Sequence, residues 1–227
     1  MNNNTVSPSG FIIFSFFALM FFSLQSCVSA RNRSTPKKEK HEWRIVKTDK
    51  QAEPSWVIYT RAIAGTSFLE YKIEGDIQSS PHACLASFRQ ELYAQANDTK
   101  NKKYPTYKIA DESRESLLTY VIHREPFPLK DTEMSVRYTF FSDEDGSTSV
   151  RWNEAWNESP VQPSKKLNRV KTFRGSWSFF PASGNACKAA NVVQFDPGKM
   201  PLWLVQPMVF SFFKGGLRDI REKAGEL

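Results

Sequence analysis

The alternation of apolar and polar side chains predicts a chain built mainly from short strands. Residues 68–77 place Phe68, Tyr71, Ile73 and Ile77 between polar neighbours. Runs rich in β-branched and aromatic residues are typical of strands. Such runs occupy residues 43–48, 56–64, 106–109, 117–123, 134–142, 147–156, 170–180 and 189–195. We expect these strands to pair in antiparallel order, with residues 143–146 forming a hairpin turn.

Two segments have the spacing of helices instead. The first begins after Ser79 or Ser80, either of which is a suitable N-cap, and keeps apolar residues at helical spacing to about Ala96. Pro81 fits its first turn. The second segment, residues 202–213, is apolar nearly all round, which predicts that neighbouring elements cover more than one of its sides.

The second helix contains residues that weaken regular helix. We expect Pro207 to kink it and the Gly215-Gly216 pair to loosen its last turns. A helix of this kind could lie across the open mouth of a curved sheet and gate a cavity. A distorted core helix is the alternative.

A stiff, partly apolar loop is predicted between the runs 117–123 and 134–142. Pro126 and Pro128 each fix φ at about −65° and push the preceding residue toward extended backbone, so regular pairing cannot continue through them. Because Phe127 and Leu129 are apolar, we expect this loop to cover something.

The composition is that of a globular protein. With 227 residues, 40% hydrophobic and 14% aromatic, the chain is too rich in large apolar side chains to be disordered. We expect one domain with a sizeable core, preceded by a leader that is removed. We find no internal repeat in the sequence.

The leader is predicted to occupy residues 1–26, which carry no charged side chain. Its apolar block, residues 11–24, would span about 21 Å as a helix, short of the ~30 Å hydrocarbon core of a membrane. A cleaved secretion signal is therefore favoured over a transmembrane helix. A chain with such a signal would enter an export pathway.

The end of the leader, Leu-Gln-Ser-Cys at residues 24–27, resembles a bacterial lipobox. This resemblance implies lipidation of Cys27 as the mature N-terminus, whereas an ordinary signal peptide with an incidental Cys27 is the alternative. Val28 resembles the sorting pattern of outer-membrane lipoproteins. We therefore expect a bacterial outer-membrane lipoprotein facing the periplasm, with a soluble periplasmic or secreted protein as the alternative.

A basic tether is predicted over residues 27–42. Between residues 28 and 50, eight Lys or Arg stand against three acids, which gives +5 of the total net charge of +7. Beside an acylated Cys27 these cations would lie on anionic lipid head groups, each contributing up to ~1 kcal/mol; a solvated linker is the alternative. Because the excess charge is concentrated here, the pI of 9.3 does not indicate nucleic-acid binding.

Few residues offer catalytic or metal-binding chemistry. Cys84 and Cys187 are predicted to be buried free thiols. A disulfide is the alternative, because the distance between their Cα atoms decides between the two and the sequence does not show it. The sequence has no Cys-x-x-Cys pattern, so no metal site and no cofactor are predicted. His41, His82 and His123 accompany no nucleophile motif such as Gly-x-Ser-x-Gly, so no catalytic residue is predicted and the chain is not expected to be an enzyme.

From Trp43 to Ile220 the chain resembles the START family of lipid transfer domains, the relatives of the steroidogenic acute regulatory protein. The resemblance is carried by the order and spacing of several short segments: residues 57–61 (Val-Ile-Tyr-Thr-Arg), 74–75, 80–81, 126–129 (Pro-Phe-Pro-Leu), 135–137, 174–177 (Arg-Gly-Ser-Trp) and 196–203. It implies an α+β domain over residues 43–223 with the helix-grip (START/Bet v 1-like) fold. In this fold a curved antiparallel sheet wraps around a long C-terminal helix and encloses a tunnel for one lipid.

The resemblance also implies a function. We expect a monomer that binds one hydrophobic ligand, a fatty acid, phospholipid or sterol-like lipid, and carries or presents it at a membrane. A ligand-sensing or adaptor lipoprotein without transfer activity is the alternative, and an enzyme of the helix-grip superfamily is a third. The residues that we expect at the ligand are Tyr120, Ile122, Phe127, Leu129, Arg137, Thr139, Phe141, Arg174, Val209 and Phe213.

The sequence departs from the family pattern at charged positions. Where the family's loop usually ends in Arg-Asp, residues 131–133 are Asp-Thr-Glu, so the ion pair of that Arg is missing or rearranged. Arg137 matches a cavity Arg of some members, but Tyr120 or a close neighbour stands where they place its acidic partner. Arg137 therefore points to solvent or toward an anionic or carbonyl-bearing ligand. Two cavity arginines, Arg137 and Arg174, would favour a fatty acid or phospholipid over a sterol.

Overall fold

The computed structural model describes residues 42–49, 55–125, 130–159, 161–162, 164–196 and 202–226. The predicted leader, Cys27 and nearly all of the basic tether lie outside the described residues. The loop with Phe127 and Leu129 lies outside them as well.

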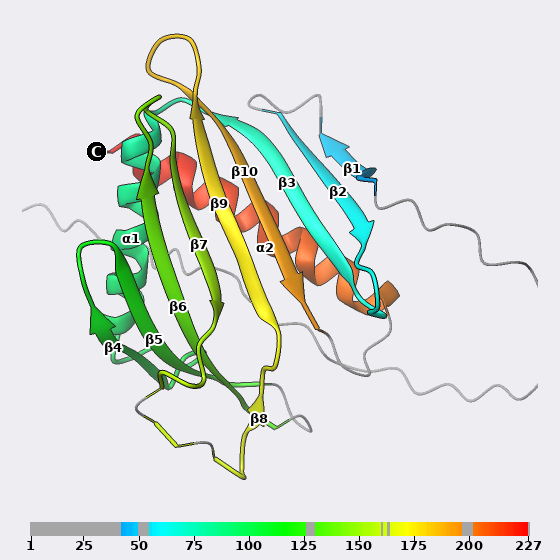
Figure 1. Cartoon of the computed structure of the whole chain (residues 1–227), viewed down its shortest axis with the longest axis vertical. Coiled ribbons are helices and arrows are strands. Elements are labelled where there is room, and N and C mark those ends of the chain that lie inside the picture. Colours follow the sequence, from blue (N-terminus) through cyan, green and yellow to red (C-terminus); the bar gives the residue numbers. More distant parts are fainter. Residues whose placement is uncertain are drawn as a thin grey trace, which may run out of the picture.

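The described part of the chain forms one antiparallel sheet and two helices (Figure 1). In chain order the elements are β1 Arg44–Asp49, β2 Trp56–Ala62, β3 Leu69–Ile77, α1 Pro81–Asn97, β4 Thr106–Glu112, β5 Ser116–His123, β6 Thr132–Ser142, β7 Thr148–Glu154, β8 Asn168–Arg169, β9 Phe173–Pro181, β10 Cys187–Phe195 and α2 Leu202–Ala224. The strand and helix pattern expected from the sequence is recovered, except that the short β8 was not predicted.

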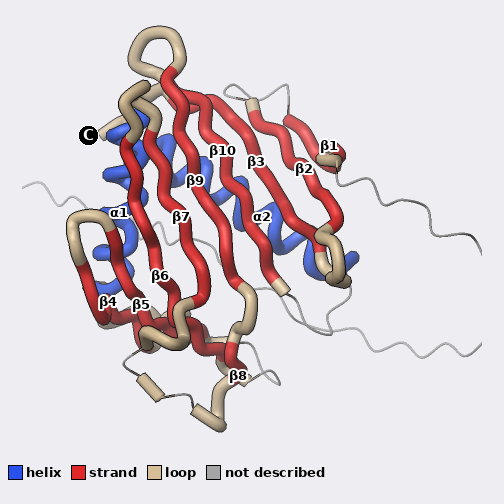
Figure 2. The backbone as a smooth tube through the Cα atoms, viewed as in Figure 1, coloured by secondary structure: helices blue, strands red, loops and turns tan. Residues whose placement is uncertain are grey.

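The sheet is curved, and both helices lie on one of its faces (Figure 2). Its strand order is β1-β2-β3-β10-β9-β7-β6-β5-β4, and neighbouring strands are antiparallel. The parallel pairing of β8 with β6 is an exception to the antiparallel order that we expected. A curved sheet wrapped around a C-terminal helix is the predicted helix-grip fold, which is thus confirmed.

Helix α1 begins as its sequence predicts. The hydroxyl oxygen of Ser80 accepts a hydrogen bond from the backbone N–H of Ala83 at 3.2 Å, and Pro81 occupies the first turn. The buried face of α1 rests on the sheet, where the ring of Phe88 stacks on that of Trp152 at a centroid distance of 6.3 Å. Capping and apolar packing therefore fix this helix against β7.

Helix α2 is longer than the apolar run predicted. It continues through Pro207 and past Gly215 to Ala224, so the glycines do not end it. The physical reason is continued packing, because Leu217 and Ile220 beyond the glycines are each 1% exposed. None of the described helices is long and apolar enough to cross a membrane.

The C-terminal half of α2 is fixed to the rest of the fold. The hydroxyl of Ser79 donates to the carbonyl oxygen of Ala224 at 2.8 Å. The Arg221 guanidinium donates to two backbone carbonyls, those of Asp76 at 2.9 Å and Ser55 at 3.0 Å. These bonds join the last turns of α2 to β3, α1 and the start of β2.

Strand alternation divides the sheet into an inner face, which the helices cover, and an outer face. One row of inner-face residues crosses the sheet from β2 to β5, and its members pair in register: Thr60, Tyr71, Val193, Gly175, Trp152, Tyr138 and Leu117. The core lies between this face and the helices. The sheet register therefore determines which side chains reach the interior.

Candidate functional site

The space between the inner face and α2 is the candidate site. Val209 and Phe213, both predicted at the ligand, are 6% and 0% exposed and belong to the core of α2 and the sheet. Gly215 is also buried, yet a Cβ atom built there would meet nothing within 4 Å beyond the backbone of its own helix. The interior beside this turn of α2 therefore has unfilled room.

Three buried polar atoms at the centre of the inner face have no hydrogen-bond partner in the described part of the chain. They are the hydroxyl of Tyr71, Nε1 of Trp152 and Oδ1 of Asn191. Their residues are 1%, 5% and 1% exposed. Burying such an atom without a partner costs about 1–3 kcal/mol, and most buried polar atoms in proteins are paired.

The residues that carry these three atoms lie near Val193 of β10 in the strand register. Tyr71 pairs with Val193 across β3, and Gly175 pairs with it across β9. Asn191 lies two residues before Val193 on the same face of β10, because side chains alternate along a strand. We call Tyr71, Trp152 and Asn191 the polar triad.

Trp152 reaches this place because Gly175 has no side chain. A Cβ atom on Gly175 would lie 2.5 Å from Cζ2 of Trp152 and 2.9 Å from Cε2, the ring carbon bonded to the indole nitrogen. The nitrogen edge of the indole therefore lies over Gly175, one strand away from Val193. Gly175 is thus needed for this position of the indole ring.

The polar triad is neutral. Burial raises the pKa of Tyr71 to about 12, so its hydroxyl stays protonated near neutral pH. The inner-face positions of β3, β10 and β9 are all uncharged: Leu69, Tyr71, Ile73, Gly75, Ile77, Cys187, Ala189, Asn191, Val193, Phe195, Phe173, Gly175, Trp177 and Phe179. The centre of the interior therefore offers hydrogen bonds without charge.

The polar triad was not predicted from the sequence, although one signal was present. Along β10 the inner positions read Cys187, Ala189, Asn191 and Val193, so a single amide stands in an apolar series. A polar residue on the buried face of a central strand needs a partner or a ligand. Tyr71 and Trp152 gave no such signal, because aromatic residues are ordinary in a core.

Six of the predicted ligand residues alternate toward the outer face instead. Leu117 and Tyr138 pair on the inner face, so their neighbours along β5 and β6 point the other way. A shift of one residue moves every side chain of a strand to the other face. The residues placed on the outer face, and thus away from α2, are Tyr120, Ile122, Arg137, Thr139, Phe141 and Arg174.

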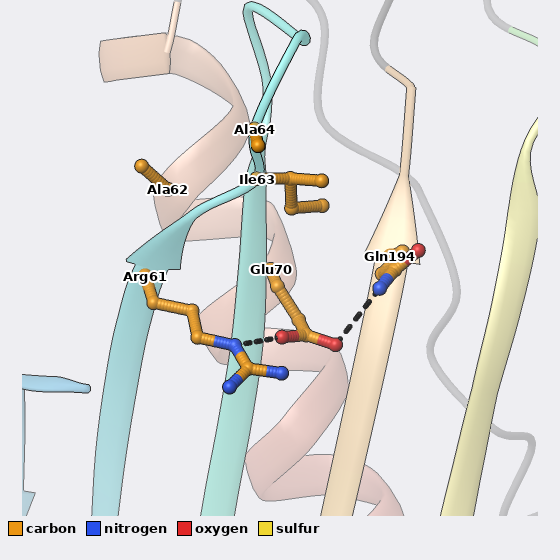
Figure 3. A pocket seen from close by; sticks show the side chains of 6 residues that line it. All are labelled: Arg61, Ala62, Ile63, Ala64, Glu70 and Gln194. Carbon is orange, nitrogen blue, oxygen red and sulfur yellow. Dashed lines mark hydrogen bonds and ion pairs between the residues drawn. The ribbon is translucent and has the colours of Figure 1, made fainter. Parts of the chain in front are cut away.

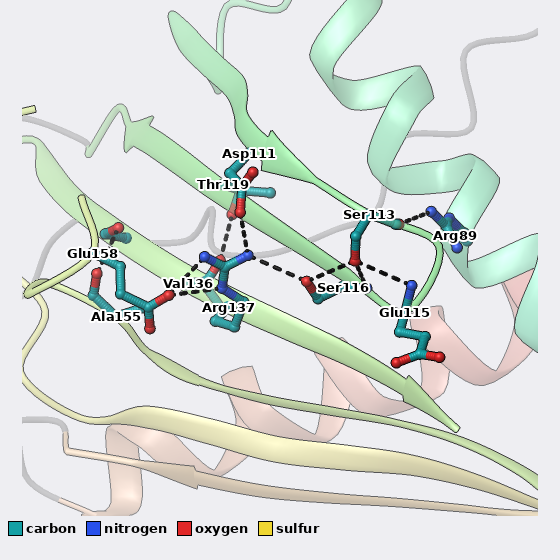
Figure 4. A network of polar contacts seen from close by, with 11 residues as sticks. Arg89, Asp111, Ser113, Glu115, Ser116, Thr119, Val136, Arg137, Ala155 and Glu158 are labelled. Atoms are coloured by element: carbon teal, nitrogen blue, oxygen red, sulfur yellow. Dashed lines mark hydrogen bonds and ion pairs between the residues drawn. The ribbon is translucent and has the colours of Figure 1, made fainter. Parts of the chain in front are cut away.

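Arg137 is held by two acids that were not predicted as its partners (Figure 4). Its Nη1 lies 2.8 Å from Oδ2 of Asp111 on β4, and its Nη2 lies 2.6 Å from Oε2 of Glu158, which follows β7. The hydrogen bonds that the guanidinium donates to Asp111 and Glu158 raise the pKa of Arg137. Arg174 is ion-paired with Glu154 and half-exposed. Neither arginine is therefore available in the interior to favour an anionic lipid, contrary to the prediction.

Tyr120 belongs to a separate polar cluster on the outer face. Its hydroxyl donates to Oε2 of Glu133 at 3.0 Å, and Glu133 is 0% exposed. The segment around β8 covers this carboxylate: Arg169 lies 3.5 Å from Oε1, and the backbone N–H of Ser164 donates to it at 3.3 Å. The Arg169 guanidinium also lies 3.8 Å from the ring centre of Trp156. This cluster joins β8 to the sheet.

A small pocket opens at the end of β2 and β3 (Figure 3). Its volume is about 160 Å³, below the roughly 300–1,000 Å³ usual for ligand pockets. Glu70 in its wall pairs with Arg61 and accepts from Nε2 of Gln194 at 2.9 Å. Its polar groups satisfy one another, so this pocket is a weaker candidate than the interior.

Solved structures of other proteins share this fold. No family model matches the sequence, and no curated protein matches it. Solved structures do match. A STAR-related lipid transfer protein from Xanthomonas axonopodis is 18% identical with a TM-score of 0.63, over 80% of this chain and 98% of that one.

Two human structures are similar to the same extent. The lipid transfer and protein localization domain of StarD13 is 12% identical, with a TM-score of 0.63 over 82% of this chain and 90% of that one. STARD10 is 14% identical, with a TM-score of 0.62 over 82% and 74%. The resemblance inferred from the sequence is confirmed at the level of fold.

Proposed function

We propose that this chain, which has the fold of STAR-related lipid transfer domains, binds one lipid between its sheet and α2 and carries or presents it at a membrane. The observation that carries the proposal is the polar triad on the inner face, where the Tyr71 ring contacts Phe210 of α2, together with the room at Gly215 on the same helix. The solved lipid transfer proteins with the same fold support it.

The binding energy would come from apolar burial. The inner face and the buried side of α2, with Val205, Val209 and Phe213, give the interior apolar walls. A lipid that leaves water for such walls gains about 25 cal/mol per Å² of buried apolar surface. The ligand would return to a membrane readily, because the bilayer offers it a similar apolar environment.

The start of α2 is the surface that we propose for membrane contact. Trp203 is 74% exposed and Leu202 is 36% exposed, in the first turn of the helix. Trp side chains favour the interface between lipid and water. In the cell, an acylated Cys27 and the basic tether would hold a monomer at the periplasmic side of the outer membrane.

Lipid uptake is the first test of this function. The purified protein is incubated with a bacterial lipid extract, and native mass spectrometry then measures bound lipid. We expect one lipid per chain. Absence of any adduct, together with no uptake of fluorescent fatty acid, phospholipid or sterol, would overturn the proposal.

A pair of variants tests whether the ligand lies beside α2. Gly215→Leu fills the room beside α2 and should abolish uptake, whereas Lys214→Leu, on the exposed side of the same turn, should retain it. Exchange between donor and acceptor vesicles then separates two functions: lipid transfer requires exchange, and tight uptake without exchange favours a ligand sensor.

A further inference from the structure

The three members of the polar triad differ in what they can bind, and together they restrict the polar group of the ligand. Nε1 of Trp152 can only donate a hydrogen bond, and Oδ1 of Asn191 can only accept one. The Tyr71 hydroxyl can do either. A ligand group that satisfies all three must itself both accept and donate.

A hydroxyl is the smallest neutral group that meets this requirement. It would accept from Trp152 and donate to Asn191, and Tyr71 would complete the arrangement. A carboxylate or an ester only accepts, so either would bring an acceptor against Oδ1 of Asn191. That contact would leave the amide oxygen unsatisfied and the ligand weakly held.

The distribution of charged side chains also favours a neutral ligand over an anion. The inner faces of β3, β10 and β9 carry no cation, and the guanidinium groups of Arg137 and Arg174 pair with acids on or beside the outer face. An anion beside the polar triad would therefore lack a counter-charge, which is unfavourable in an apolar environment.

We propose that Tyr71, Trp152 and Asn191 form a subsite for the hydroxyl group of a neutral lipid alcohol and discriminate against fatty-acid anions. This inference rests on the proposed function, since it names the class of lipid that the same interior takes. The hydrocarbon part would lie along the apolar side of α2.

Displacement of a fluorescent reporter tests the subsite. The neutral dye N-phenyl-1-naphthylamine is bound first, and 1-dodecanol, laurate and methyl laurate, which share one chain length, compete at pH 8. We expect dodecanol to displace the dye at a concentration about tenfold below that of the other two. Laurate that competes as well as dodecanol would overturn the subsite and leave lipid binding intact. Failure of dye and competitors alike to bind would overturn both.

Two variants test the residues. Tyr71→Phe and Asn191→Leu should each weaken dodecanol binding about 3- to 10-fold, the effect of one hydrogen bond, and neither should weaken methyl laurate binding to the same extent. The unfolding temperature of the ligand-free variants should stay the same or rise, because an unsatisfied buried atom is removed.

The outer-face variants Tyr59→Phe and Asn153→Leu are matched controls and should leave dodecanol binding unchanged. A lower unfolding temperature for Tyr71→Phe and Asn191→Leu, with equal loss of all ligands, would assign these residues a purely structural part and overturn the proposal.

Discussion

Cys84 on α1 and Cys187 on β10 face each other with their Sγ atoms 3.6 Å apart, and both residues are 0% exposed. They are free thiols, as the sequence predicts, and the alternative of a disulfide is not adopted. The contact joins the first turns of α1 to the start of a central strand, β10. It is therefore a packing contact between helix and sheet.

The thiol pair predicts low reactivity. The hydrogen bond with Cys187 and burial both raise the pKa of Cys84, whereas the same hydrogen bond lowers the pKa of Cys187. Both residues are fully buried, so neither Sγ atom is open to a reagent. In a chain that begins after Cys27, N-ethylmaleimide at pH 7.5 should modify neither thiol in the folded state and both in guanidinium. A protein lighter by two hydrogens, and unreactive in guanidinium until reduced, would show a disulfide instead.

Substitution of Gly175 should be destabilising. Gly175→Ala would push its methyl group into the Trp152 ring and the carbonyl of Val192, and overpacking of this kind costs about 1–3 kcal/mol. Gly215→Ala, in open space within α2, should instead stabilise by about 0.5–1 kcal/mol. Urea unfolding measures both. Equal stability of Gly175→Ala and wild type would contradict the position of the indole.

In the cluster under β8, we expect loss of the arginine to destabilise the fold more than loss of the carboxylate charge. Arg169→Met strands the carboxylate of Glu133, which is fully buried, and should cost about 3 kcal/mol. Glu133→Gln should cost less, because the side chain of Arg169 is 31% exposed and can turn to water, and because Tyr120 and Ser164 keep a polar partner. Chemical denaturation of the two variants and of the double variant tests the order. A larger loss for Glu133→Gln would refute it.

Lys103 predicts a pH dependence of stability. Burial lowers its pKa from 10.5 to about 8, although Glu125 opposes the shift. Between pH 8 and 10.5 the unfolded chain therefore binds more protons at this site than the folded chain, so the contribution of Lys103 to the unfolding free energy rises with pH.

The comparison of Lys103→Met with wild type isolates this effect. The stability advantage of the variant should be largest near pH 7 and should shrink as the pH approaches 10. Lys102→Met, at an exposed position in the same loop, is the control. A difference that stays constant from pH 7 to 10 would mean that burial does not perturb Lys103.

We expect the exposed ring of Trp203 to speed lipid exchange by contacting the membrane. Trp203→Ala should leave the unfolding free energy within about 0.5 kcal/mol, as for other surface changes, and slow lipid exchange between vesicles. Phe180→Ala is the matched control: this ring is 50% exposed near the β9–β10 turn, at the far end of the sheet from the start of α2 (Figure 1). Equal exchange rates for the two variants would exclude Trp203 as the contact.

The sequence predicted the elements well because local signals define them. Ser80 and Pro81 mark the start of α1, and Gly146, with φ of 81°, closes the predicted hairpin turn. Which side of a strand faces the helices was harder to predict. Leu118, Tyr120 and Ile122 are as apolar as their neighbours in β5, and both faces of this strand are largely buried, so apolar character does not distinguish the inner face from the outer one.

The candidate site could not be predicted for a related reason. Arg137 obtains its carboxylates from Asp111 and Glu158, which lie 26 and 21 positions away in the chain, and only the fold brings them together. The polar triad joins residues of β3, β7 and β10 through strand register alone. Long-range pairing of this kind leaves little trace in a single sequence.

The bonds at the end of α2 have a mechanical consequence. Ser79 and Arg221 secure the last turns of the helix to backbone atoms, whereas its first turn presents Trp203 to the surroundings. If the helix moves to admit a ligand, the end held by Ser79 and Arg221 would move least and the turn with Trp203 would move most. The interior would then open at the Trp203 end of α2 and stay closed at the Arg221 end.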